Sequence, residues 1–202
     1  MPDDFYTYKT IAANADAEFK DRGSRFIAYA LHITSIDEFK VALKNLKALH
    51  PKAVHHCFAY RIGTDKRTFR AVDDGEPSGS AGKPILGVID SNGLSNCAVV
   101  VVRYFGGTLL GVPGLINAYK SSAQAAIDVA GIISKEETNL YELEFDYTIQ
   151  SAVNKALHQL EADIIRTENL LFCKLICEIK KRDFAKAGQL LDGIHNLQYK
   201  MS

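Results

Sequence analysis

A run of valines marks the most apolar strand of the chain. Residues 98–102 read Ala-Val-Val-Val-Val without a polar position, which is typical of a strand that is covered on both faces. Before it, residues 54–62 alternate between two faces, and residues 67–72 return across a short turn as a hairpin partner. The pattern therefore predicts a central strand over 96–104 with a hairpin elsewhere in the same domain.

Helical spacing is clear in three other segments. Ser35 can cap a helix, because a glutamate follows three positions later and the apolar residues beyond it share one face until Pro51. Pro84 stands where the first residue of a short helix belongs, since its missing N–H costs nothing there. Residues 114–130 predict a small-residue helix that Gly131 closes.

The amino terminus is rich in strand-forming positions. Residues 5–12 and 17–19 predict a strand pair with a turn near Asn14. A charged turn over 20–26 then leads into a further strand that runs through Ile33. Together with the strands and helices over residues 35–131, these strands predict a mixed α/β domain.

A polar and charged stretch, residues 134–139, predicts the domain boundary. We therefore expect an amino-terminal domain over 1–134 and a carboxyl-terminal domain over 139–202. The second domain follows the order β-α-β-β-α with a short sixth strand, which is the split β-α-β, ferredoxin-like pattern. Its expected elements are strand 141–149, helix 151–161, strands 163–167 and 170–179, helix 183–191 and strand 197–200.

Composition narrows the class of protein. The chain has 202 residues, is 47% hydrophobic and has no net formal charge, although residues 1–135 carry 16 basic and 13 acidic side chains. A nucleic-acid binder that neutralises phosphates usually shows a stronger bias, so any such role must depend on a local patch. No apolar run is long enough for a membrane helix, and no secretory signal is visible. Four cysteines without zinc-type spacing favour a reducing, cytoplasmic location.

The loop over 73–82 is the first candidate site. Ser78 and Ser80 lie among glycines just before a helix start, with Lys83 beside it, and such loops present N–H groups and a positive dipole end to an anion. The spacing does not match a Walker loop. The alternative is a structural loop whose carboxylates cap backbone groups and pair with arginines.

Acidic residues in the same loop suggest a second chemistry. Asp73, Asp74 and Glu76 could hold magnesium through oxygen ligands. A zinc site at residues 55–57 is not expected, because adjacent strand residues point to opposite faces and no second ligand pair has the right spacing. Serine hydrolase chemistry is disfavoured too, because the nucleophile-elbow spacing is one residue short. We therefore assign no metal and no cofactor.

Arg103 is the strongest single candidate for binding. It stands at the end of the apolar strand, and Gly106 and Gly107 let a ligand or another backbone come close. With His55 and Tyr104 they outline a candidate pocket. The alternative is a buried ion pair between Arg103 and Asp73 or Asp74. His56, Cys173 and Cys177 are assigned to the core.

These residues carry a family likeness. Residues 73–86 and 100–111 resemble the signature of the Impact/YigZ family, and residues 55–61 and 24–26 match its other blocks. The resemblance implies an amino-terminal α/β sandwich of the kind shared by ribosomal-protein, RNase P protein and GHMP-kinase domains, with a left-handed β-α-β crossover. The carboxyl half is similar to a ferredoxin-like domain of elongation factor G.

The resemblance also implies a role in translation. Eukaryotic relatives block activation of a stress-responsive initiation-factor kinase through protein contacts on its ribosome-associated activator. We expect a translation-associated regulator that binds RNA or the ribosome without turnover, with Arg25 and Arg61 joining Lys83 and Arg103 on phosphates. Two alternatives stay open: a magnesium-dependent enzyme acting on a nucleotide or phosphorylated substrate, and a protein-interaction module whose partner is a translation-regulatory protein. The oligomeric state is not indicated.

Overall fold

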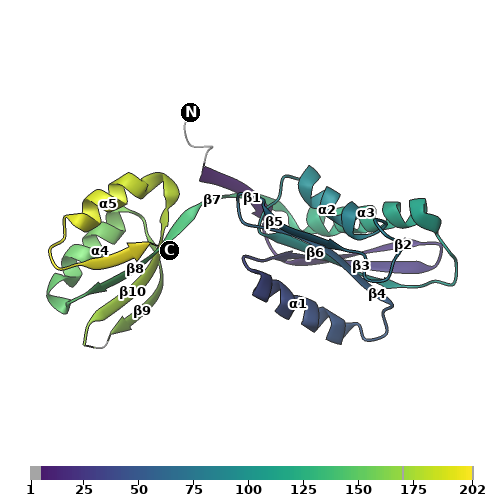
Figure 1. The fold of residues 1–202 in the computed structure, drawn as a ribbon, viewed down its shortest axis with the longest axis horizontal. Coiled ribbons are helices and arrows are strands. Elements are labelled where there is room, and N and C mark those ends of the chain that lie inside the picture. Colours follow the sequence, from purple (N-terminus) through teal and green to yellow (C-terminus); the bar gives the residue numbers. More distant parts are fainter. Residues whose placement is uncertain (1–5, 170, 202) are drawn as a thin grey trace. The chain divides into compact units, whose positions relative to one another are not determined.

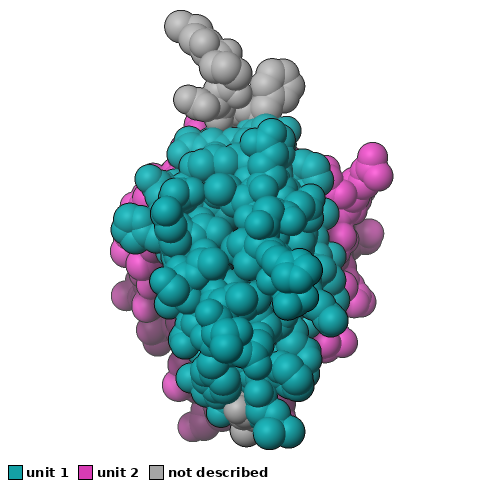
Figure 2. Space-filling model, turned by 90° about the vertical axis from the view of Figure 1, so that its left-hand side faces the viewer, with its two compact units in different colours: residues 1–7, 136–202 teal, residues 8–135 magenta. Residues whose placement is uncertain are grey.

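The chain divides into two compact units, each with its own core. A computed structural model describes residues 6–169 and 171–201, and its ribbon is drawn in Figure 1. Unit 1 groups residues 1–7 with 136–202, and unit 2 spans residues 8–135; they are coloured separately in Figure 2. Of the described residues before β1 and at its start, Tyr6 and Thr7 are grouped with the carboxyl-terminal part. In the described part of the chain, no helix has the length and apolarity needed to span a membrane.

Unit 2 is built on a five-stranded sheet with the order β2-β3-β6-β4-β5, in which each neighbouring pair is antiparallel. The strands are β2 (Ala15–Asp21), β3 (Ser24–His32), β6 (Cys97–Tyr104), β4 (His55–Ile62) and β5 (Thr68–Val72). The valine-rich β6 lies in the centre, as its apolar run predicted, and residues 98–102 are fully buried. The predicted β4–β5 hairpin is also confirmed.

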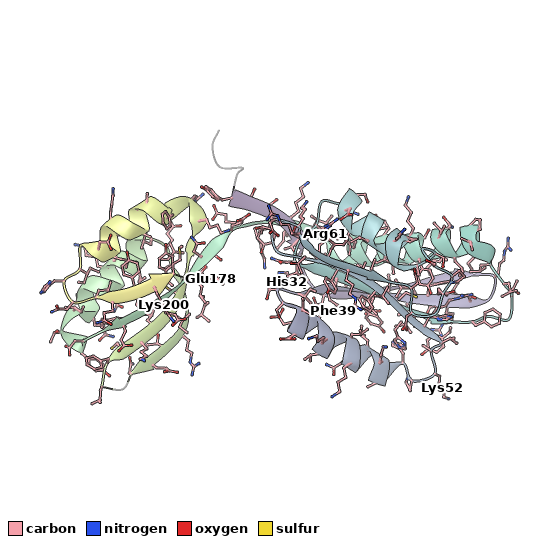
Figure 3. The ribbon with its side chains drawn as sticks, viewed as in Figure 1. His32, Phe39, Lys52, Arg61, Glu178 and Lys200 are labelled. Atoms are coloured by element: carbon pink, nitrogen blue, oxygen red, sulfur yellow. The ribbon has the colours of Figure 1, made fainter. Side chains whose placement is uncertain are left out.

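Helices cover both faces of this sheet. Figure 1 shows α2 (Gly82–Ser91) and α3 (Gly111–Ala130) on one face and α1 (Ile36–Leu49) on the other. Ile85 and Ile89 of α2 join α3 in the larger core cluster. Phe39 of α1, which points toward the sheet in Figure 3, packs in the second cluster. The double cover explains why β6 is apolar at both alternating sets of positions.

The predicted cap of α1 is present. Ser35 accepts a hydrogen bond from the backbone N–H of Glu38 at 3.2 Å, and the Glu38 carboxylate accepts one from the backbone N–H of Thr34. The first bond satisfies a donor that the first helical turn leaves without an intrahelical partner, and the second ties the residue before the cap to the helix. The side chain of Glu38 therefore reaches one residue further back than a capping box requires.

The amino-terminal strand pair was predicted wrongly. β1 (Thr7–Ile11) pairs with β7 (Ile132–Glu136) in a separate two-stranded sheet, whereas β2 pairs with β3. Ala12 donates to the carbonyl of Gly131 at 2.9 Å where these two strands meet. Local spacing could not indicate this pairing, because more than a hundred residues separate β1 and β7. The polar 134–139 segment is largely strand, since backbone pairing does not require apolar side chains.

Unit 1 has the predicted β-α-β-β-α-β order. Its sheet has the order β11-β8-β10-β9, again antiparallel throughout. The elements are β8 (Thr138–Phe145), the 3₁₀ turn η2 (Tyr147–Ile149), α4 (Gln150–Gln159), β9 (Asp163–Asn169), β10 (Cys173–Lys180), the 3₁₀ turn η3 (Lys181–Asp183), α5 (Phe184–Asp192) and β11 (Gln198–Met201). Leu143, Leu175 and Val153 lie in its core, and Cys173 and Cys177 are buried free thiols, as predicted.

Candidate functional site

The predicted site residues come from strand ends at one edge of unit 2. His55, at the start of β4, is directly opposite Arg103 near the end of β6. Arg25, near the start of β3, is opposite Tyr104. The loop over 73–82 and the bend after Tyr104 reach the same region, because Asp74 contacts His55 and Gly106 contacts Ser24. Two segments far apart in the sequence thus meet there.

Arg103 is buried in an ion pair. Its Nη1 donates to Oε1 of Glu76 at 2.6 Å, and the two side chains are 6% and 4% exposed. The sequence left a buried pair with Asp73 or Asp74 as the alternative, but the partner is Glu76. The guanidinium also lies 5.4 Å from the ring centre of Phe26. Because solvent does not reach it, Arg103 is not available to a phosphate in this conformation.

Tyr119 and Cys57 complete the buried network. The Tyr119 hydroxyl of α3 donates to Oε1 of Glu76 at 2.7 Å, and the Sγ of Cys57 lies 3.3 Å from that hydroxyl and 2.9 Å from the carbonyl oxygen of Asp73. Burial raises the pKa of the Cys57 thiol to about 12, and burial also raises the pKa of Tyr119. Sequence reasoning missed Tyr119. The available signal was a tyrosine in a helix made mostly of small or apolar residues, because a buried tyrosine hydroxyl usually has a hydrogen-bond partner.

Asp73 occupies the position that a phosphate was expected to take. Its carboxylate accepts the backbone N–H groups of Gly79 at 2.8 Å, Ala81 at 3.0 Å and Gly82 at 2.8 Å. Burial raises the pKa of Asp73, but these three bonds outweigh that effect and hold the pKa below its usual value. The N-terminus of α2 is therefore already capped by an anion from its own chain.

The other carboxylates of the loop are directed elsewhere. Asp74 accepts the backbone N–H of His56 at 2.7 Å, while Glu76 binds Arg103 and Tyr119. Consequently the three acidic residues do not converge on one point. In the described ranges, no group of three or more His, Cys, Asp or Glu side chains is placed to hold a metal ion.

The serines and the lysine of the loop have separate environments. Ser80 is buried and donates through Oγ to the carbonyl of Pro77 at 2.6 Å, so its hydroxyl closes the loop. Ser78 is exposed, and so is Lys83 on the first turn of α2. Lys83, the fourth cation expected at the site, is on the surface, and no carboxylate of the described residues is hydrogen-bonded to it.

Histidine 55 connects the loop to the sheet. Its Nδ1 lies 2.8 Å from the carbonyl oxygen of Asp74, which can only accept, so Nδ1 carries a proton. Its Nε2 lies 3.9 Å from Oε1 of Glu76. His56, on the opposite face of β4, is buried as predicted; its Nε2 has no hydrogen-bond partner within the described residues. Burial lowers the pKa of His56.

The remaining arginines do not join this centre. Arg25 forms an exposed pair with Glu18, with Nη2 and Oε2 2.6 Å apart. Arg61 pairs with Asp90 near the other end of β4, and Figure 3 shows it at the opposite end of the sheet from Lys52. Each of these predicted phosphate ligands therefore has its own carboxylate.

The residues of the predicted pocket do not lie on one face of the sheet. Tyr104 lies on the α1 face of the sheet, where its hydroxyl is 2.9 Å from Nδ1 of His50, whereas Arg103 lies on the opposite face. Gly106 packs directly against Gly23, and its N–H donates to Ser24 at 3.2 Å. Gly107 is exposed and has a φ of 87°. The close approach allowed by Gly106 is therefore to another backbone segment of the same chain.

An apolar surface lies next to the buried network. We name it the 105–116 surface, and its exposed fractions range from 38% to 82%. It consists of Phe105, Leu109, Val112 and Ile116. The Phe105 ring centre lies 5.7 Å from the guanidinium carbon of Arg103, which connects this surface to the interior ion pair. None of these four residues was singled out from the sequence as a binding residue.

Comparison with known proteins identifies the family. The model of the Impact N-terminal domain matches residues 22–127, which include the 73–82 loop and Arg103. YigZ of Escherichia coli, an IMPACT family member, is 34% identical over 154 residues, covering 75% of this chain and 76% of that protein. The chain belongs to the Impact family. YvyE of Bacillus subtilis, another member, is 32% identical over 184 residues, which are 90% of this chain and 85% of that protein.

A solved structure is similar to this chain over both units. A crystal structure described as that of a hypothetical protein is 30% identical and has a TM-score of 0.74. The match covers 96% of this chain and 97% of the chain in that structure. The two-domain mixed α/β architecture expected from the sequence is thus found in a solved structure, and the likeness includes the carboxyl-terminal unit that lies outside the matched family domain.

Proposed function

We propose that this Impact family protein regulates translation by binding a ribosome-associated protein, in the cytoplasm and without turning over a substrate. Family membership supports both the link to translation and the choice of a protein partner. The resemblance implies that the eukaryotic relatives regulate translation and that they do so through protein contacts. Of the three functional hypotheses drawn from the sequence, the protein-interaction module agrees best with the geometry of unit 2.

The observation that carries this proposal is the pairing of the expected phosphate ligands. Arg103 is bonded to Glu76, Arg25 to Glu18 and Arg61 to Asp90. An RNA-binding surface depends on cations that are free to replace the counterions of phosphate groups. Three of the four expected cations are instead matched by carboxylates of the same chain, which makes an RNA surface at these positions unfavourable.

The 105–116 surface offers a different kind of contact. Its four exposed apolar residues lie in the bend after β6 and in the first turns of α3. Exposed apolar clusters of this kind commonly mark protein-binding surfaces, where aromatic and aliphatic anchors supply most of the binding free energy. Phe105 links this surface to the buried Arg103–Glu76 pair, because its ring centre lies 5.7 Å from the guanidinium carbon of Arg103.

The experiment is cosedimentation of the full chain with ribosomes, before and after a high-salt wash that removes associated proteins. We expect sedimentation with unwashed ribosomes, its loss after the wash, and recovery when the washed-off proteins are returned. A Leu109→Ser, Val112→Ser variant should bind at least about tenfold more weakly, since each buried apolar anchor contributes on the order of 1–2 kcal/mol. A Val41→Ser, Leu49→Ser variant, which changes exposed residues of α1, is the matched control and should sediment as the unmodified chain does.

Two outcomes would overturn the proposal. Equal sedimentation of the 105–116 variant and the control would show that this surface is not used. Binding to salt-washed ribosomes that falls steeply with ionic strength and with Lys83→Ala would assign the function to RNA binding instead.

A further inference from the structure

The outer strand of the unit 1 sheet has an unpaired edge. β9 is the last strand in the order β11-β8-β10-β9, so alternate backbone N–H and C=O groups along it face away from every other strand described in this unit. Six of its seven residues are exposed. Edge strands of this kind accept a further strand from another chain unless side chains or a covering segment prevent it.

The edge is only partly protected. β9 contains no proline and no lysine, the residues that most often block an edge. Ile164 and Ile165 are 54% and 56% exposed, and Leu171 and Phe172 beyond the strand are also exposed. A β-bulge at Ile165 interrupts the ladder with β10, but residues 166–169 pair with β10 in regular register. The regular segment is therefore the part that a further strand can join.

Charges on this segment are arranged symmetrically. Arg166 and Glu168 share the sheet face of Ile176 and Lys174, their partners on β10, while Thr167 between them lies on the helix-covered face. Arg166 and Glu168 contact each other in the single chain, and both side chains are at least 40% exposed. A strand of the same sequence running antiparallel can place a glutamate opposite each arginine.

We propose that β9 pairs with β9 of a second copy of this chain, antiparallel and about a two-fold axis through Thr167. Arg166 of each copy then lies directly opposite Glu168 of the other, and the two threonines face each other. Opposite charges and paired threonines are both favourable cross-strand neighbours. The result is an eight-stranded sheet with an isologous interface.

Other registers fit less well. When two sheets join edge to edge into one sheet, residues directly opposite each other must point to the same face. For two identical antiparallel strands, the two-fold axis must therefore pass through a residue position. An axis through Arg166 opposes two arginines, and an axis through Glu168 opposes two glutamates. An axis through Ile165 falls on the bulge. Only the axis through Thr167 pairs unlike charges within the regular segment.

Apolar residues support the same arrangement. In this register Ile165 of one copy lies opposite Asn169 of the other, so Leu171 and Phe172 of the second copy follow near Ile164 and Ile165 of the first. Apolar groups that are exposed in the single chain would thereby be covered. The interface is small, so we expect a weak dimer with a Kd of micromolar order.

The test is sedimentation equilibrium of the full chain without ribosomes, over a range of protein concentrations. Arg166→Glu and Glu168→Arg should each weaken the dimer by about tenfold or more, because like charges then face each other twice. An equimolar mixture of the two variants should associate again, since each glutamate of one meets an arginine of the other. Arg67→Glu, an equal charge change at an exposed position of unit 2, is the matched control.

The double variant Arg166→Glu, Glu168→Arg should also dimerise, because exchange of the two charges preserves their complementarity. Recovery in the mixture or in the double variant excludes a folding defect as the cause of the single-variant effect. A monomeric unmodified chain up to millimolar concentration, or single variants that dimerise as the unmodified chain does, would overturn the proposal. Because ribosomes are absent, either result leaves the translation proposal to its own experiment.

Discussion

At the scale of single residues, the interior ion pair is the central feature of unit 2. Arg103 and Glu76 are bonded to each other, and Glu76 also accepts the hydroxyl of Tyr119. Nε of Arg103 has no hydrogen-bond partner among the described residues. A buried pair is costly to form, but removal of one partner costs more, because the other charge is left without compensation. This network therefore fixes the 73–82 loop against the end of β6.

Glu76→Gln should destabilise the protein by about 3 kcal/mol, because it leaves the guanidinium of Arg103 buried opposite a neutral group. The measurement is the free energy of unfolding from urea titration. Glu18→Gln is the control, since it removes the exposed partner of Arg25 and should change that free energy by less than about 1 kcal/mol. Equal losses in both variants would contradict this account of the interior pair.

Asp73 should make the stability of unit 2 depend on acid. Its pKa is lower in the folded chain than in the unfolded chain, so its contribution is present above the ordinary aspartate range near pH 4 and is lost as the pH falls through the folded value. Asp73→Asn should therefore be less stable than the unmodified chain at pH 7, with the difference narrowing below about pH 4. Unfolding titrations across this range test it.

The control for the acid dependence is Asp163→Asn, which changes an exposed residue of unit 1. Its free energy of unfolding is measured over the same pH range, so that loss of an aspartate at an exposed position is compared directly with loss of Asp73. If the free energies of unfolding of Asp73→Asn and the unmodified chain differ by the same amount at every pH, Asp73 acts through its shape and not through its charge.

At the scale of elements, two loops are held together by backbone contact. Gly106, in the bend after β6, lies against Gly23 in the turn before β3. A Cβ atom at Gly106 would come within 1.9 Å of the Gly23 carbonyl carbon. Only glycine permits this approach, and the bend in turn sets the start of α3 and the 105–116 surface.

Gly106→Ala should cost about 3 kcal/mol or more of unfolding free energy, because neither backbone can move without breaking the Gly106 N–H bond to Ser24. Gly87→Ala is the comparison: Gly87 is inside α2 with open space around its Cβ position, so alanine should stabilise the helix by up to about 1 kcal/mol. Thermal and urea unfolding of both variants measure the contrast. A tolerated alanine at 106 would show that the two loops are free to separate.

At the scale of the whole molecule, each unit encloses its own core. Unit 2 has one cluster on each face of its sheet, whereas unit 1 has a single cluster between its sheet and its two helices. Each cluster draws its described members from within one unit. Independent cores imply that damage in one unit is not transmitted to the folding of the other.

Leu143→Ala should weaken unit 1 alone, by about 2–5 kcal/mol, because Leu143 is 2% exposed in the core of that unit. Hydrogen exchange followed residue by residue is the measurement, with faster exchange expected over 138–201 and unchanged exchange over 24–130. Ala126→Gly, in the core side of α3, should give the reverse pattern. Uniform acceleration in both units would indicate a single cooperative unit instead.

Several elements were predictable because their determinants are local. The valines of β6, the Ser35 cap of α1 and the alternating positions of β8 each define an element through neighbouring residues in the chain. The pairing of β1 with β7 was missed, since it joins segments that no local pattern connects. The importance of Glu76 over Asp73 and Asp74 was missed for the same reason, because the three lie within four residues and differ only in what they face.

By itself, the sequence determined the element order of unit 1, the central strand and main helices of unit 2, the two-domain architecture and the concentration of unusual residues between Asp73 and Gly111. Periodicity, capping and glycine spacing act over a few residues, and they are readable without coordinates. Only the tertiary structure decided what those residues do to one another. It buried Arg103 against Glu76, directed Asp73 to the N-terminus of α2 and left apolar side chains exposed at 105–116. Burial and charge pairing depend on distances through space, and those are set only when distant segments pack together.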